Sequence, residues 1–258
     1  MLELRDFPQA EIMDIGKSFS YQFEDKQWIT KLGLGALISL VPILNVALTG
    51  YMVGIIRNVT ADAREPLPNW DNLGQQFRDG LILAAASLVY AAPLLIVVCL
   101  PLGFLALPGV VSQYNNWQEV GRSIAGAGGV LFACLFCLFS LYILLFSIIH
   151  PVIFVIFSRE GTFASCFKLT EIFRILSLNA RPFFTIWLVT IIGSFAVGLL
   201  VAFANLVLGL IPCLGWIASL LLGLSSAMYI ITLDAHLFGQ FRVVAFGQPA
   251  LTLTPTAP

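Results

Sequence analysis

Two ionisable side chains lie within long apolar segments, where a membrane protein could carry out chemistry. His150 precedes Ser158, the end of one apolar run, by eight residues, and Asp234 precedes Arg242 by eight residues in another. A carboxylate at the bilayer centre costs about 2.5–3.5 kcal/mol on insertion scales, so such residues often mark a functional interior. If both helices run in the same direction, the two side chains lie at one depth, about 12 Å from the boundary at about 1.5 Å per residue. His150 and Asp234 are therefore a candidate intramembrane polar pair.

A purely structural role is the alternative for both residues. Asp234 could reach the headgroups at the cytoplasmic face or cap a break in another helix. His150 could hydrogen-bond a local carbonyl, although the neighbouring Pro151 kinks a helix and could turn the imidazole inward.

A second candidate site lies in the charged segment after the first apolar run. Cationic side chains beside a membrane helix attract anionic lipid headgroups, and tryptophan prefers headgroup depth. The same residues could instead form an ordinary structural collar at the cytoplasmic face. The candidate lipid-headgroup or structural collar comprises Arg57, Asn58, Arg64, Trp70 and Arg78.

The other reactive residue types form no recognisable catalytic or metal-binding motif. Cys134 and Cys137 form a CxxC in an uncharged apolar run without a second ligand pair, so packing or lipid contact is expected. The chain has 2 histidines, which offer little for general acid–base catalysis, and no glycine-rich phosphate loop. We therefore expect no enzyme, no catalytic residues, no cofactor and no bound metal.

Composition places these residues in a membrane. Hydrophobic residues make up 59% of the 258 and charged residues only 10%, with a mean hydropathy of +0.94. A soluble domain has roughly 25% charged residues, so this chain cannot cover a globule with a solvated surface. The net charge of −1 gives no field that would attract nucleic acid.

Long apolar runs predict full transmembrane helices, because each exceeds the length of about 20 residues that crosses a bilayer. Pro101 and Pro108 are expected to disrupt the first of these helices near its end. The predicted spans are residues 80–110, 124–157, 183–211 and 217–241.

Amphipathic segments precede some of these spans. Residues 8–28 place Ile15 and Phe19 at helical spacing among polar neighbours, which predicts a helix in the membrane interface. Residues 158–182 have a similar pattern. Residues 1–247 are expected to form a single integral membrane domain, and the Thr/Pro-rich residues 248–258 a disordered tail.

The first apolar segment is broken. The broken hairpin, residues 29–57, contains an apolar run over 32–56 that is nominally long enough for one tilted span, but Pro42 removes a backbone donor and Asn45 follows it. The segment is either one kinked span or a re-entrant pair of half-helices. A break at membrane depth must be covered by protein or water, so we expect it to pack against later spans, with the Asn45 amide capping freed carbonyls.

The distribution of basic residues favours the re-entrant arrangement. The 13 lysines and arginines divide 5 to 8 if residues 32–56 cross once, but 12 to 1 if they re-enter, with only Arg122 outside. The positive-inside bias favours the second division. The sequence thus predicts an all-α polytopic membrane protein with a re-entrant or short helical hairpin, a cytoplasmic connection over residues 58–79, four full spans and cytoplasmic amphipathic helices. Both termini are expected in the cytoplasm.

The first third of the chain carries a family resemblance. In order, its motifs are Tyr21, Phe23, Asp25, Trp28, Lys31, Gly35, Pro42, Gly50–Tyr51, Arg57–Asn58, Leu67–Pro68, Trp70–Asp71 and Asp79–Gly80. This succession resembles a prokaryotic membrane-protein family catalogued as domain of unknown function 4013, with Asn69 where an acidic residue is expected. The resemblance implies a multi-pass protein of the bacterial or archaeal plasma membrane. It implies no activity, because the family's function is unassigned.

From these features we expect a non-enzymatic accessory or scaffolding subunit. Its partners would be the lipid bilayer and other membrane-protein subunits or further copies of itself, and not nucleic acid. The alternative is a small-solute or ion transporter or channel that uses the broken hairpin and the His150/Asp234 level, since broken helices form substrate sites in many transporters.

Overall fold

The computed structural model describes residues 13–111, 118–211 and 214–247, which are helical with no strand among them. The chain divides into two compact units. The first comprises Met1–Ala84 and Pro151–Pro258, and the second comprises Ala85–His150. The predicted tail 248–258 lies outside the described residues.

Four helices are long and apolar enough to cross a membrane, as the hydropathy predicts. α7 is displaced from its predicted span by three residues toward the N-terminus, whereas the other three helices extend past their predicted spans at both ends. They extend because polar residues can continue the backbone hydrogen bonds of a helix outside its apolar core. The four helices are α4 (Leu73–Val111), α5 (Gln118–Glu160), α7 (Ala180–Leu208) and α8 (Leu214–Phe246).

The prediction that prolines interrupt the first span is wrong. α4 is helical through both Pro101 and Pro108, and α5 continues through Pro151. A proline removes only one backbone hydrogen bond, whereas ending the helix within lipid would leave several backbone groups unpaired. Continuing the helix is therefore the lower-energy choice.

The N-terminal segment is not the single helix predicted over residues 8–28. Its described part forms α1 (Ile15–Ser20), followed directly by the 3-10 helix η1 (Tyr21–Glu24) and a turn. Asp14 begins α1 by accepting a hydrogen bond from the Lys17 amide at 2.8 Å.

This segment buries polar side chains and leaves its phenylalanines on the surface, where a helix in the membrane interface would place them against lipid. Phe19 and Phe23 are exposed, whereas Ser18, Tyr21 and Gln22 are fully buried. These polar side chains hydrogen-bond to α8 or to their own segment, which offsets the cost of removing them from water. The exposed phenylalanines are left on the outer surface of the first unit.

A helical hairpin comes next in the chain, made of α2 (Trp28–Ser39) and α3 (Val46–Thr60). The chain leaves helix between them, over a stretch that contains Pro42 and Asn45. Both residues are exposed and Asn45 makes no side-chain cap, so the expected packing and carbonyl capping of the break are wrong. The turn instead pairs its own backbone groups, as in the 2.9 Å hydrogen bond from the Asn45 N–H to the Val41 carbonyl.

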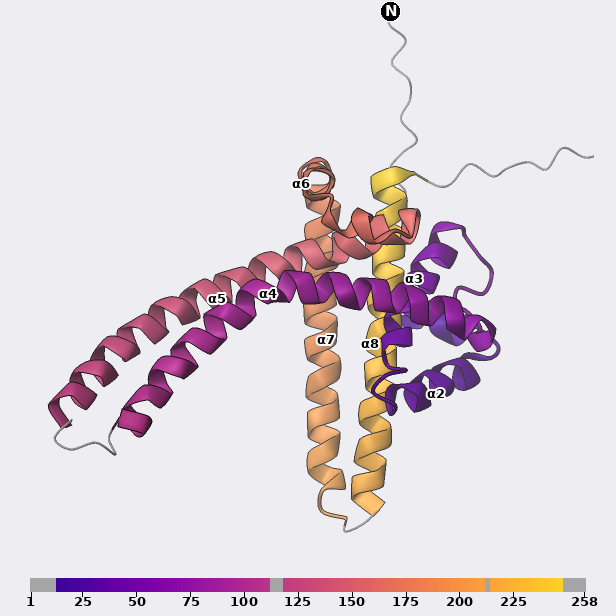
Figure 1. Ribbon diagram of the computed structural model, residues 1–258. Helices are drawn as coiled ribbons and strands as arrows, with labels where there is room; N and C mark the ends of the chain where they lie inside the picture. The colour runs from indigo at the N-terminus through magenta and orange to yellow at the C-terminus, as the bar shows by residue number, and fades with distance from the viewer. Residues whose placement is uncertain (1–12, 112–117, 212–213, 248–258) are drawn as a thin grey trace, which may run out of the picture. The chain divides into compact units, whose positions relative to one another are not determined.

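The core of the first unit lies around α3. Most of α3 is buried, as are residues 152–157 at the end of α5 and most of residues 232–241 in α8. α8 contacts α1, α2, α3 and α7, and Figure 1 shows α7 and α8 running side by side. Close van der Waals packing stabilises such contacts within a membrane, where the hydrophobic effect between helices is weak.

The segment predicted to be amphipathic over residues 158–182 contains η3 (Phe163–Phe167) and α6 (Leu169–Leu178). α6 buries Ile172 and Ile175, and exposes Phe173. It packs on α7.

The second unit pairs the remaining part of α4 with the remaining part of α5. The Tyr142 hydroxyl of α5 donates to the Tyr90 carbonyl of α4. The Tyr90 ring also lies 5.8 Å from that of Phe146. These contacts fasten the two helices to each other.

Candidate functional site

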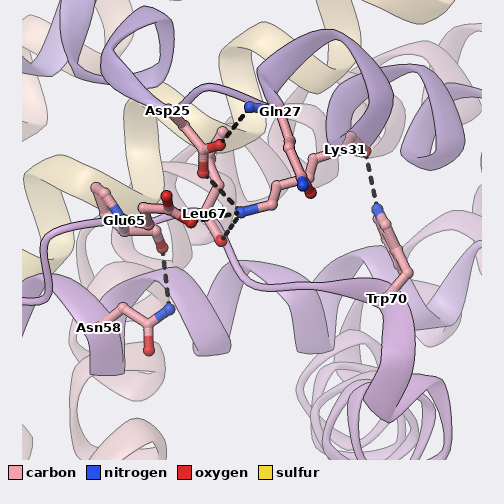
Figure 2. Close-up of polar contacts among 8 residues, drawn as sticks. Asp25, Gln27, Lys31, Asn58, Glu65, Leu67 and Trp70 are labelled. Carbon is pink, nitrogen blue, oxygen red and sulfur yellow. Dashed lines mark hydrogen bonds and ion pairs between the residues drawn. The ribbon is translucent and has the colours of Figure 1, made fainter.

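A buried ion pair joins the start of α2 to the connection after α3. Lys31 Nζ lies 2.7 Å from Asp25 Oδ2 and donates a second hydrogen bond to the Leu67 carbonyl at 2.9 Å. The other oxygen of Asp25 accepts from the Gln27 amide at 2.8 Å, as Figure 2 shows. The two charged side chains are only 5% and 0% exposed. Buried charges require such partners in place of water, so the pair fixes three segments in one arrangement.

Trp70 also holds the connection on the hairpin, through one contact with α2 and one with α3. Its indole N–H donates to the Lys31 carbonyl at 2.8 Å, and its ring stacks on Tyr51 with centroids 4.4 Å apart. Asn58 of α3 donates to the Pro66 carbonyl at 3.1 Å (Figure 2). The connection is thereby held on both helices of the hairpin.

Arg57 is the centre of a second charged cluster. It lies 2.6 Å from Asp79 Oδ2 of α4 and donates to the Ser158 carbonyl of α5 at 3.0 Å. The Ser158 hydroxyl in turn accepts from Arg242 of α8 at 3.0 Å. Arg57 is 30% exposed and Asp79 only 7%. One guanidinium therefore links α3 to the start of α4 and to the end of α5.

α3 and α4 cross at backbone distance. A Cβ atom on Gly50 would lie 1.7 Å from the Gln76 carbonyl oxygen, and one on Gly80 would lie 1.9 Å from the Val46 carbonyl oxygen. Only glycine permits an approach this close, a device common in membrane helix packing. The crossing also brings Asp79, the neighbour of Gly80, to α3.

Polar contacts hold the N-terminal segment on α8. The Tyr21 hydroxyl donates to the Thr232 carbonyl at 2.8 Å, and its ring stacks on His236 with centroids 4.1 Å apart. Ser18 Oγ lies 2.8 Å from His236 Nδ1, and Gln240 Nε2 lies 3.1 Å from the same nitrogen. Burial raises the pKa of Tyr21 well above its usual value, so the phenol keeps its proton and remains a donor.

The structure divides the predicted collar into two groups. Arg57, Asn58 and Trp70 make contacts within the chain, which correspond to the structural alternative for these residues. Arg64 and Arg78 are exposed. Their position leaves them available to headgroups or solvent.

The predicted polar pair falls in different units, with His150 in the second and Asp234 in the first. The His150 ring lies 5.2 Å from Phe146 within its own unit. Asp234 lies beside Thr190 of α7, whose hydroxyl is a polar neighbour of its carboxyl group, and Asp234 Oδ1 is buried. The pairing of His150 with Asp234 stays a prediction.

Sequence reasoning missed the Asp25–Lys31 pair and the role of His236. A six-residue spacing across a turn matches no standard pairing pattern, and a lone histidine carries little signal. A signal did exist in the motif residues on which the family resemblance depends. Several contacts between segments are made by these residues: Tyr21, Asp25, Lys31, Gly50–Tyr51, Arg57–Asn58, Trp70 and Asp79–Gly80.

The motif residues link neighbouring elements of the fold. The ions form pairs, and the amide and hydroxyl groups bond backbone carbonyls of neighbouring segments. In the part of the chain that the structure describes, no three His, Cys, Asp or Glu side chains are grouped to hold a metal. The arrangement fixes the N-terminal segments against the membrane helices.

A helical chain with four apolar helices long enough to cross a bilayer is a multi-pass membrane protein. More particularly, it belongs to the family described as Protein of unknown function (DUF4013), whose model matches residues 34–206. The match confirms the family resemblance, covers its motifs from Gly35 onward and extends into α7. No curated protein and no solved structure matches the chain.

Proposed function

We propose that this protein is a non-enzymatic accessory or scaffolding subunit of a bacterial or archaeal plasma membrane, which acts by packing with lipid and with other membrane proteins. The observation that carries the proposal is the apolar surface of the α7–α8 hairpin. A surface of this kind needs lipid or a partner helix to cover it. Its exposed large side chains include Phe195, Leu199, Leu200, Phe203, Leu206, Leu210, Leu214, Trp216, Ile217 and Leu220.

The use of charge within the first unit supports the same proposal. Asp25 with Lys31, and Arg57 with Asp79, link segments of one chain at 2.6–2.7 Å. Together with the contact that holds α1 on α8, such links give α1, α2, α3 and the connection one fixed arrangement, which we call the N-terminal platform. A rigid N-terminal platform attached to the apolar α7–α8 hairpin suits a protein that positions other membrane proteins beside it.

In this proposal both termini lie in the cytoplasm, and α2 and α3 enter and leave the membrane from that side. The 12 to 1 division of basic residues supports this orientation. α6 supports it as well, because the exposed Leu169, Phe173 and Leu178 suit a helix lying in the interface. The internally bonded turn at Pro42 lowers the cost of its exposure to lipid.

Photo-crosslinking in membranes of the native host tests the scaffolding role. A benzophenone amino acid in place of Phe203 on α7 or Leu220 on α8 is expected to give a discrete protein adduct of the full-length chain, because both side chains are exposed on the apolar hairpin. The same probe at the exposed loop residue Arg64 is the control and is expected not to give that adduct. Adducts with lipid alone at both hairpin positions would contradict the proposal.

A transporter or channel is the second candidate, and Asp234 is the observation that favours it. Its Oδ1 is buried within an apolar helix, where the Thr190 hydroxyl is its polar neighbour. Ionisable side chains at membrane depth often mark ion and proton pathways. Liposomes containing the protein and an internal pH indicator separate the two roles. A pathway predicts proton flux that Asp234→Asn abolishes, whereas a scaffold predicts no flux beyond that of empty liposomes.

A further inference from the structure

A cleft in the first unit is lined by charges of both signs. It has a volume of about 360 Å³ and lies between α1, the loop after α3 and the last turns of α8. Lys17 and Arg64 contribute positive charge, and Asp14, Glu24 and Asp62 contribute negative charge. His236, only 4% exposed, forms part of the wall. The volume falls within the range of about 300–1,000 Å³ that is typical of small-ligand sites.

Four of the five charged side chains at the cleft differ from the other charged clusters of the first unit, whereas the fifth, Asp14, accepts a hydrogen bond from the Lys17 amide. Lys17, Glu24, Asp62 and Arg64 are exposed, and their charged groups make no ion pair or hydrogen bond within the described residues. The three closest ion pairs among those residues, by contrast, have distances of 2.6–2.7 Å. Opposite charges that surround one hollow without pairing to each other can be satisfied together by a zwitterion that lies between them.

Apolar side chains beside the charges indicate that the zwitterion is attached to an apolar group. Val243 and Val244 line the cleft within the last turn of α8, and Val59 lines it from the end of α3. The end of a membrane-spanning helix lies at the depth of the lipid headgroups. The cleft therefore has charged side chains beside apolar ones, as a phospholipid has a charged headgroup attached to apolar chains.

We propose that the cleft binds a phosphoethanolamine group. Lys17 and Arg64 donate to the phosphate, where charge-assisted hydrogen bonds are strong. Glu24 and Asp62 accept from the ammonium. The group can arrive as the headgroup of phosphatidylethanolamine or as soluble glycerophosphoethanolamine, and the position at the end of α8 favours the lipid. This site goes beyond the scaffolding role and does not depend on it.

Calorimetric titration of the full-length protein in detergent tests the proposal with three short-chain lipids. Dihexanoyl phosphatidylethanolamine is expected to bind saturably. The matching phosphatidylcholine, whose ammonium has no N–H, and phosphatidylglycerol, which has no ammonium, are each expected to bind about tenfold more weakly, the effect of losing one hydrogen bond to a charged group. Soluble glycerophosphoethanolamine is titrated in parallel, and equal affinity for it would support the site while identifying the headgroup as the sole determinant.

Two double variants locate the binding. Lys17→Ala with Arg64→Ala, and Glu24→Gln with Asp62→Asn, are each expected to weaken phosphatidylethanolamine binding at least about tenfold. Arg78→Ala is the control, because Arg78 is exposed but does not line the cleft. All the changed side chains are exposed, so gel filtration is expected to show unaltered folding. Equal binding of the three lipids, absence of binding, or binding that both double variants leave unchanged would overturn the proposal.

Discussion

Replacing Gly50 by alanine is expected to lower the free energy of unfolding by about 3 kcal/mol, the upper part of the usual range for overpacking a close-packed interior. The new Cβ would lie 1.7 Å from the Gln76 carbonyl oxygen, a backbone atom that cannot rotate away. α3 and α4 would have to separate, which would also break the ion pair between them. Gly80→Ala is expected to act in the same way, because its Cβ would lie 1.9 Å from the Val46 carbonyl oxygen.

Denaturant titration in mixed micelles measures this effect, with two other glycines as matched controls. Gly33 and Gly74 are also helical, and a Cβ at either position would meet nothing within 4 Å. Alanine at either position is expected to be neutral or to stabilise by up to about 1 kcal/mol, since it favours helix over glycine. If Gly50→Ala were as stable as Gly33→Ala, α3 and α4 would not cross at backbone distance.

Replacing Lys31 by methionine is expected to lower the free energy of unfolding by about 3–5 kcal/mol, the usual effect of removing one partner from a buried ion pair. Methionine keeps much of the side-chain volume, so the loss is electrostatic rather than a cavity effect. The variant leaves the fully buried Asp25 carboxylate without its cation, and the Leu67 carbonyl without its donor. The same denaturant titration measures the change.

A second substitution separates charge from packing at this site. Asp25→Leu combined with Lys31→Met is expected to be more stable than Lys31→Met alone by at least about 1 kcal/mol, because no unpaired charge is then buried. Lys168→Met is the control, since the pair of Lys168 with Glu160 is exposed, and little change is expected. A Lys31→Met variant no less stable than Lys168→Met would mean that the buried pair does not hold the platform together.

The spanning helices could be predicted because hydropathy acts over long windows. Each predicted span overlaps one long helix, and the largest errors lie at the ends, where polar residues remain helical. The effect of proline on the first span was predicted wrongly, because only its local effect on the helix was considered. Its effect on one hydrogen bond is easy to see in a sequence, whereas the cost of unpaired backbone groups in lipid depends on the whole surrounding membrane.

The position of the break after α2 was predicted correctly, but the residues around it were not. Pro42 and Asn45 both lie in the turn, yet neither is packed against later helices. The N-terminal segment shows the same difficulty, because periodicity indicates which residues are apolar, whereas the buried face depends on hydrogen bonds to α8. Tyr21 is buried for that reason and Phe19 is not.

The sequence identified which residues belong to the candidate sites, but it did not identify the residues that they contact. Arg57 and Trp70 were identified as cytoplasmic collar residues, but their partners Asp79 and Tyr51 lie 22 and 19 positions away. Such pairings arise from the crossing of helices, which a single sequence does not reveal. The Asp25–Lys31 pair required the same tertiary knowledge.

The orientation of the α2–α3 hairpin is tested most directly by the accessibility of single cysteines at its two ends. Ser20 and Ala63 are exposed, and each is replaced by cysteine in a variant without the 5 native cysteines. A membrane-impermeant maleimide is expected to label both positions in inside-out vesicles and neither in right-side-out vesicles. Labelling of the two positions from opposite sides would mean that residues 32–56 cross the membrane once, and would contradict a hairpin that enters and leaves on the cytoplasmic side.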